Sequence, residues 1–192
     1  GGLIGTGIAA GIHQLIVWPR VIVIFIAWIL TPVFAGLSSM MIRFGIDFVW
    51  PKIKCYRSGE RIFSPLCSER VARVLLMLTG CYMAFNWGAN DVANAIGVLS
   101  GVSRLSLSKV TFLGGLAMSS GALTWGKRVM LTVGEKITPL TPRAALLVEF
   151  AAALTVNVFT LVGMPVSTTH AIVGAISGLG LGKGRGYLNL PI

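Results

Sequence analysis

Charged side chains are scarce in this sequence. Only 11% of its 192 residues are Asp, Glu, Lys or Arg, whereas a soluble globular domain carries about 25%. Hydrophobic residues make up 55% of the chain, and the mean hydropathy is +0.83. The composition therefore favours an integral membrane protein over a water-soluble domain.

Cysteine and acidic residues are also few. The three cysteines, Cys55, Cys67 and Cys81, are scattered and lack CxxC spacing, which argues against a disulfide framework and against a zinc site. Only 6 residues are acidic against 16 basic ones, giving a net charge of +10. In a membrane protein this excess is typical of basic cytoplasmic loops, so we predict no nucleic-acid partner. The chain begins Gly-Gly with no charged region before its first apolar run, so we expect no signal peptide and interpret the sequence as a fragment.

Long apolar runs alternate with basic stretches. Val21 to Ile42 contain no charge, and about 20 such residues span a bilayer as a helix. Residues 43–73 are rich in Lys and Arg, as expected for a cytoplasmic linker. Apolar residues return in 74–101, 110–126 and 144–182, so we expect roughly five to six membrane segments. The predicted fold class is an all-α, multi-pass integral membrane protein of the cell membrane, surrounded by lipid.

The stretch Gly88-Ala-Asn-Asp-Val-Ala-Asn-Ala is unusually polar for an apolar segment. On a helix, Asn86, Asn90 and Asn94 share one face because residues four apart are neighbours, and Asp91 lies beside them. Carboxylate and carboxamide oxygens are hard ligands suited to Na⁺, and Asp91 alone would also suit a proton relay. An acid at the centre of a membrane helix costs about 2.5–3.5 kcal/mol, which favours a function for Asp91.

Three other polar residues in apolar runs have less specific readings. Asn86 is interpreted as an interhelical hydrogen-bonding residue, a contact worth roughly 0.6 kcal/mol on average. Glu149 lies close after Arg143, and both a structural and a functional role remain open for it. His170 has no second His or Cys at ligand spacing, so we predict a hydrogen-bonded structural residue.

A break within 144–182 indicates a second site. Gly163 and Pro165 end the preceding helix because proline lacks an N–H and clashes with the turn before it. A new helix start offers unpaired N–H groups and the positive end of the helix dipole, which favours an oxyanion such as phosphate or sulfate. The alternative is a proline kink whose hydroxyls bond back to the helix. Three residues of helix N-cap type stand at the break: Ser167, Thr168 and Thr169.

Together the two stretches resemble the inorganic phosphate transporter family, the Pho-4 or sodium/phosphate symporter group. GANDVANA precedes Pro165-Val-Ser-Thr-Thr-His, and Ala27-Trp-Ile-Leu-Thr-Pro32 is similar to the family's Trp-x-x-(Ser/Thr)-Pro helix. Members carry both signatures twice, in inverted repeats with discontinuous helices around a central site. Here each occurs once, which implies that 1–42 ends a first repeat, 43–73 is the linker and 74–192 is most of a second repeat.

The resemblance also implies roles for particular residues. It assigns Asp91 and Asn94, together with Asn90, to Na⁺ coordination. It assigns inorganic phosphate to the hydroxyl residues Ser167, Thr168 and Thr169. Both groups would form one site only if Asp91 lies beside the Ser-Thr-Thr turn.

The implied function is phosphate symport with Na⁺ or H⁺ by alternating access, a transport activity and not an enzymatic one. No cofactor is expected, and a homodimer is left open. The alternatives are a sulfate or other oxyanion permease of the same fold, and a non-transporting membrane subunit whose polar residues hold helices together.

Overall fold

Helices account for nearly all of the described chain. The computed structural model describes residues 2–49, 55–57, 60–62, 69–102, 105–136 and 142–183. The predicted helical fold class is confirmed, with one addition: a two-stranded antiparallel hairpin lies within the range expected to form the linker. Other parts of that linker, including Lys52 and Lys54, lie outside the described residues. The elements are α1 (Gly2–Ala9), η1 (His13–Leu15), α2 (Trp18–Val49), β1 (Cys55–Arg57), β2 (Glu60–Ile62), α3 (Glu69–Trp87), η3 (Gly88–Val92), α4 (Ala93–Val102), α5 (Leu107–Lys136), α6 (Pro142–Leu161) and α7 (Thr168–Lys183).

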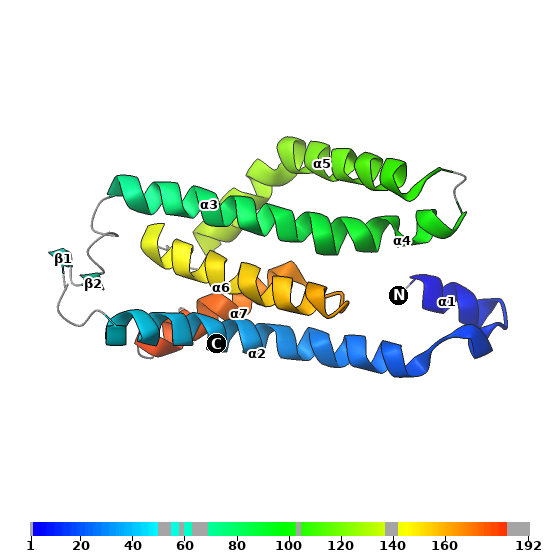
Figure 1. The fold of residues 1–192 in the computed structure, drawn as a ribbon, viewed down its shortest axis with the longest axis horizontal. Helices are drawn as coiled ribbons and strands as arrows, with labels where there is room; N and C mark the ends of the chain where they lie inside the picture. Colours follow the sequence, from blue (N-terminus) through cyan, green and yellow to red (C-terminus); the bar gives the residue numbers. More distant parts are fainter. Residues whose placement is uncertain are drawn as a thin grey trace.

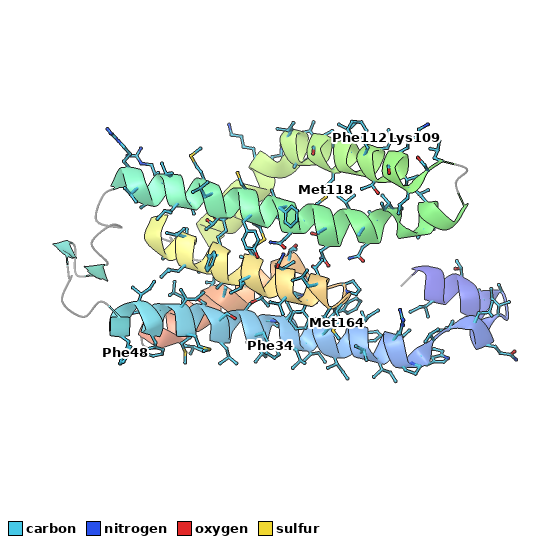
Figure 2. All side chains as sticks on the ribbon, viewed as in Figure 1. Phe34, Phe48, Lys109, Phe112, Met118 and Met164 are labelled. Atoms are coloured by element: carbon cyan, nitrogen blue, oxygen red, sulfur yellow. The ribbon has the colours of Figure 1, made fainter. Side chains whose placement is uncertain are left out.

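Two of the described helices are long and apolar enough to cross a bilayer. They are the Trp18–Ile46 part of α2 and the Ala144–Leu161 part of α6, while the apolar part of α7, Thr168–Leu181, is shorter. Large apolar side chains such as Ile29 and Phe48 are exposed along α2, and Figure 2 shows side chains standing along its outer side. Such a surface suits lipid, because a soluble protein rarely exposes a continuous apolar face of this length.

Helix α2 is longer than the predicted span of 21–42 and is not broken at Pro32, which lies inside it. A proline removes one backbone hydrogen bond from a helix interior. The buried hydroxyl of Thr31 donates to the carbonyl of Ala27 on the preceding turn, so this polar side chain is paired within its own helix. The helix also continues into the predicted linker as far as Val49.

Helix α6 occupies the centre of the structure (Figure 1), where it packs against α3 on one side and α2 on the other. Helix α7 packs against both α2 and α6. The contacts between these helices are made largely by small residues, including the fully buried Ala151, Ala152 and Ala175. A smaller cluster of Val92, Ile96, Val110 and Met118 joins α5 to η3 and α4.

The α2–α7 interface brings two backbones into direct contact. A Cβ added to Gly174 would overlap the carbonyl oxygen of Pro32, and one added to Gly178 would overlap that of Gly36. Close approach of this kind requires glycine and is typical of helix packing in membranes.

The break predicted at Gly163 and Pro165 is present, and it reverses the chain. Gly163 has a positive φ of 76°, and its N–H donates to the carbonyl of Thr160, which ends α6 in the manner of a glycine C-cap. Helix α7 then starts at Thr168 and lies back alongside α6 (Figure 1). The two half-helices therefore form a hairpin whose turn, Val162–Ser167, lies part of the way along α2.

Candidate functional site

A π-helical turn carries Asn90 and Asp91 of the polar Gly88-Ala-Asn-Asp-Val-Ala-Asn-Ala stretch. Residues 69–102 are helical throughout, but η3, from Gly88 to Val92, has π-helical hydrogen bonding between α3 and α4. Turns of this kind insert one residue into a helix and are frequent at functional sites. Within this turn Asn90 and Val92 are buried, and Asp91 between them is partly buried.

Asn90 holds the α6–α7 turn. Its Nδ2 donates to the carbonyl of Val166 at 2.7 Å, and its Oδ1 accepts from the Val166 N–H at 3.2 Å. Both residues are buried, at 3% and 4% exposure. A second donation from Nδ2 reaches Asp91 Oδ1 at 2.8 Å. Asn90 thus supplies both backbone groups of Val166 with partners where water does not reach them, and it also orients the neighbouring carboxylate.

The two sequence stretches meet at Asp91. Thr168 Oγ1 donates to Asp91 Oδ2 at 3.3 Å across 77 positions of sequence. The predicted proximity of Asp91 to the Ser-Thr-Thr turn is therefore confirmed. Each carboxylate oxygen has two lone pairs and accepts one recorded hydrogen bond, so acceptor capacity remains for a further donor or a cation.

The start of α7 presents unpaired donors next to that carboxylate. Ser167 is the N-cap, because its Oγ accepts from the N–H of His170 at 3.3 Å and its carbonyl accepts from Ala171. Within the described part of the chain, the N–H groups of Ser167, Thr168 and Thr169 have no recorded acceptor. Three successive N–H groups at a helix N-terminus are the arrangement that proteins use to hold anions.

Trp28 fixes the turn from the opposite side. Its Nε1 donates to the carbonyl of Pro165 at 3.0 Å, so that α2 and η3 both hold the same short segment. The aromatic ring also lies against Phe25, at 5.2 Å between centroids. Met164, labelled at the hairpin tip in Figure 2, packs against the core cluster of α2, α6 and α7.

Not every predicted site residue joins this arrangement. Thr169 and Asn94 are exposed in this chain, and neither side chain has a recorded partner among the described residues. The expected side-chain hydrogen bond of His170 is also missing from the described part of the chain, since only its backbone N–H is recorded in a bond. That prediction was wrong, because His170 lies on the exposed side of the first turn of α7.

Asn86 is confirmed as an interhelical hydrogen-bonding residue. Its Oδ1 accepts from Asn157 Nδ2 at 2.9 Å, and its own Nδ2 donates to the carbonyl of Tyr82. The role of Asn157 as the partner of Asn86 was not predicted, although a lone amide within an apolar run is a usable signal. Trp28 lies in the Trp-x-x-(Ser/Thr)-Pro segment noted in the sequence, but its hydrogen bond to Pro165 was not predicted. Val166 carries no sequence signal, since it acts through its backbone groups.

The atoms near Asp91 that could bind a metal ion are oxygens of several chemical types. The described residues contain no group of three or more His, Cys, Asp or Glu side chains placed to share a metal ion. A cation at this place would instead meet the Asp91 carboxylate, the Thr168 hydroxyl and nearby carbonyl oxygens, which are hard ligands.

Comparison with known proteins shows which family the sequence and the fold match. The profile of the phosphate transporter family matches residues 1–191. A protein named "putative phosphate permease" from Haemophilus influenzae is 44% identical over 136 residues, covering 65% of this chain and 32% of the relative. A protein of the same description from Pyrococcus furiosus is 31% identical over 260 aligned positions, covering 100% of this chain and 63% of the relative.

A solved structure described as the sodium-dependent phosphate transporter superposes with a TM-score of 0.71 at 27% sequence identity. The match covers 90% of this chain and 60% of that protein. The chain spans about a third to two thirds of the length of the relatives described above.

Proposed function

The chain belongs to the phosphate transporter family, and from that premise we propose that it forms part of a membrane protein that carries inorganic phosphate across the bilayer together with a cation. The observation that carries the proposal is the contact between Thr168 and Asp91. In this contact, the carboxylate proposed to bind the cation and the helix start proposed to bind the anion are one hydrogen bond apart.

Phosphate would bind at the start of α7. The unpaired N–H groups of residues 167–169 and the positive end of the helix dipole favour a bound oxyanion. The Ser167 hydroxyl accepts from the backbone of its own helix, which leaves its proton free to donate to phosphate. The hydroxyls of Thr168 and Thr169 complete the proposed phosphate-binding set.

The cation would bind at Asp91. Its carboxylate is the charged group recorded closest to the turn, and Asn94 follows on the exposed side of α4. Asn90 belongs to the proposed set through the second lone pair of its Oδ1, which already accepts from the Val166 N–H, while its Nδ2 donates to Asp91 and orients the carboxylate. Na⁺ is the preferred ion, because the similar solved structure is described as sodium-dependent.

Coupling would follow from the charges. A phosphate anion beside an unneutralised Asp91 is repelled by it, and a cation on Asp91 turns that repulsion into attraction. Each ion then raises the affinity of the other by the same factor. Alternating access would require movement of this repeat relative to a second, inverted one, for which the additional length of the relatives provides room.

Phosphate uptake by the full-length protein in proteoliposomes tests the proposal. Asp91→Asn removes the charge and keeps the shape, so we expect phosphate affinity at saturating Na⁺ to fall by roughly 5- to 150-fold, the usual size of a coupling free energy. Thr111→Val on α5 is a matched control, because its hydroxyl bonds only within its own helix.

Two results would contradict the proposal at different levels. Normal uptake with unchanged Na⁺ dependence in Asp91→Asn would remove Asp91 from coupling. Absence of phosphate uptake by the unaltered protein under every cation gradient would remove the function itself.

A further inference from the structure

A second carboxylate lies in the interface between α3 and α6, away from the turn. Glu149 is partly buried, and Thr79 Oγ1 is 3.0 Å from its Oε2. The other oxygen, Oε1, lies beside Gly80, where an added Cβ would be in ordinary van der Waals contact with it at 3.5 Å. With a rise of 1.5 Å per residue, Thr79 is about 16 Å along the helix from Asn90, and the Asn86–Asn157 pair lies between them.

No charged group is recorded against Glu149 within the described residues, where Thr79 is its recorded hydrogen-bond partner. On α3, the nearby Cys81 is exposed and the ring of Tyr82 packs against Phe150. The remaining titratable or charged residues on α6 and on the elements packed against it are Arg143 on α6, Glu69, Arg70 and Arg73 on α3, Arg20, Arg43 and Asp47 on α2, Asp91 on η3, and His170 and Lys183 on α7.

An ionised carboxylate in this position is unfavourable. At the centre of a membrane helix an acid costs about 2.5–3.5 kcal/mol even on lenient scales, and one hydroxyl offsets little of that. Binding a positive ion or a proton removes the charge. Na⁺ prefers a shell of several oxygens, whereas one recorded hydroxyl is present here. A proton needs a single acceptor, so the geometry favours a proton.

The Thr79 hydroxyl supplies an independent argument. Its Oγ1 lies 3.0 Å from the carbonyl oxygen of Leu76 and also 3.0 Å from Glu149 Oε2. A hydroxyl has one proton to donate and two lone pairs to accept with. If Glu149 carries a proton, Oε2–H donates to Thr79, which donates to Leu76, and both contacts are satisfied. If Glu149 is ionised, Thr79 has two acceptors for one proton.

We propose that Glu149 is a reversible proton-binding site, separate from Asp91, in which Thr79 accepts the carboxylic acid proton and passes its own to Leu76. The step is COO⁻ plus H⁺ from water giving COOH, with no other bond broken. Loss of the proton turns the Thr79 hydroxyl from Leu76 toward Glu149, which loosens α3 at that turn. The coupling of this exchange to transport rests on the proposed function, but the proton site itself does not.

Infrared difference spectroscopy of the purified full-length protein across a pH titration tests the site without any transport. We expect a carboxylic acid C=O stretching band that disappears as the pH rises and is absent from Glu149→Gln. Thr79→Val should shift the frequency of that band, because the acceptor of the acid proton is lost. Thr155→Val on α6 is the matched control, since that buried hydroxyl bonds only to Ala151 of its own helix.

Identical spectra for the unaltered protein and Glu149→Gln would overturn the proposal, and so would a Glu149 band that persists at every pH. Uptake of phosphate at several pH values provides the link to transport: Glu149→Gln should lose the pH dependence of uptake and retain its Na⁺ dependence. If the unaltered protein fails to transport phosphate while the band still titrates, the transport function fails and the proton site stands.

Discussion

The hydrogen bonds between Asn90 and Val166 make a strong prediction about how the α6–α7 turn is held. Asn90→Ala removes three recorded bonds, two to the backbone of Val166 and one to Asp91. It leaves the buried N–H and carbonyl of Val166 without partners, at about 1–3 kcal/mol for each group. The total expected loss is therefore about 2–6 kcal/mol.

Polar contacts in membrane proteins are weaker on average, at about 0.6 kcal/mol each. Three of them still amount to roughly 2 kcal/mol, which agrees with the lower end of the first estimate. A loss of about 2 kcal/mol corresponds to roughly a 30-fold larger population of the detached turn, since every 1.4 kcal/mol is tenfold. The apparent phosphate affinity falls only in proportion to the fraction of molecules whose turn stays docked, because only the docked turn is competent to bind.

Hydrogen–deuterium exchange of the peptide that covers residues 163–168 measures the population of the detached turn directly. We expect exchange in Asn90→Ala to be at least about 30-fold faster at this peptide and unchanged in α2. Asn94→Ala is the control, because that side chain is exposed and has no recorded partner in the described region. Equal exchange in Asn90→Ala and the unaltered protein would refute the reasoning.

Three further predictions concern the helices around the turn. Gly178→Ala should lower the melting temperature, because its methyl group meets backbone and overpacking costs about 1–3 kcal/mol, whereas Gly45→Ala has open space and should not. Trp28→Phe should weaken phosphate affinity about fivefold in uptake assays, through one lost hydrogen bond of about 1 kcal/mol; unchanged affinity would show that the indole N–H is dispensable. Thr168→Val should raise the Na⁺ concentration for half-maximal uptake, because a hydroxyl beside Asp91 is lost, and an unchanged value would exclude that hydroxyl from the cation site.

Sequence reasoning identified the helices well and their ends poorly. The charge-free run from Val21 to Ile42 predicted a spanning helix, but α2 extends beyond both ends. Charge marks where a membrane interior ends, whereas a helix continues into water as long as its own hydrogen bonds hold. The break at Pro165 was predictable from proline chemistry. The reversal at that break was not, because direction depends on packing between α7 and α2.

Some features of the candidate site were also predictable from the sequence, and others were not. Asp91 and the Ser167–Thr169 segment were identifiable because polar groups within an apolar membrane segment are energetically unfavourable and therefore stand out as candidates for a function. The π-helical turn was not identifiable, and neither was the difference in burial between the asparagines: Asn90 lies inside while Asn94 is exposed. The contact of Asn90 with Val166 joins residues 76 positions apart, and no local pattern encodes a pairing with a backbone amide.

The glycine contacts between α2 and α7 limit what can move. Because the two backbones are in direct contact with no side chain between them, neither helix can slide or tilt without displacing the other. These two helices are therefore expected to travel as one rigid unit. Any conformational change within this chain is expected to occur elsewhere, for example at α5, which contacts only η3 and α4 to an appreciable extent within the described residues.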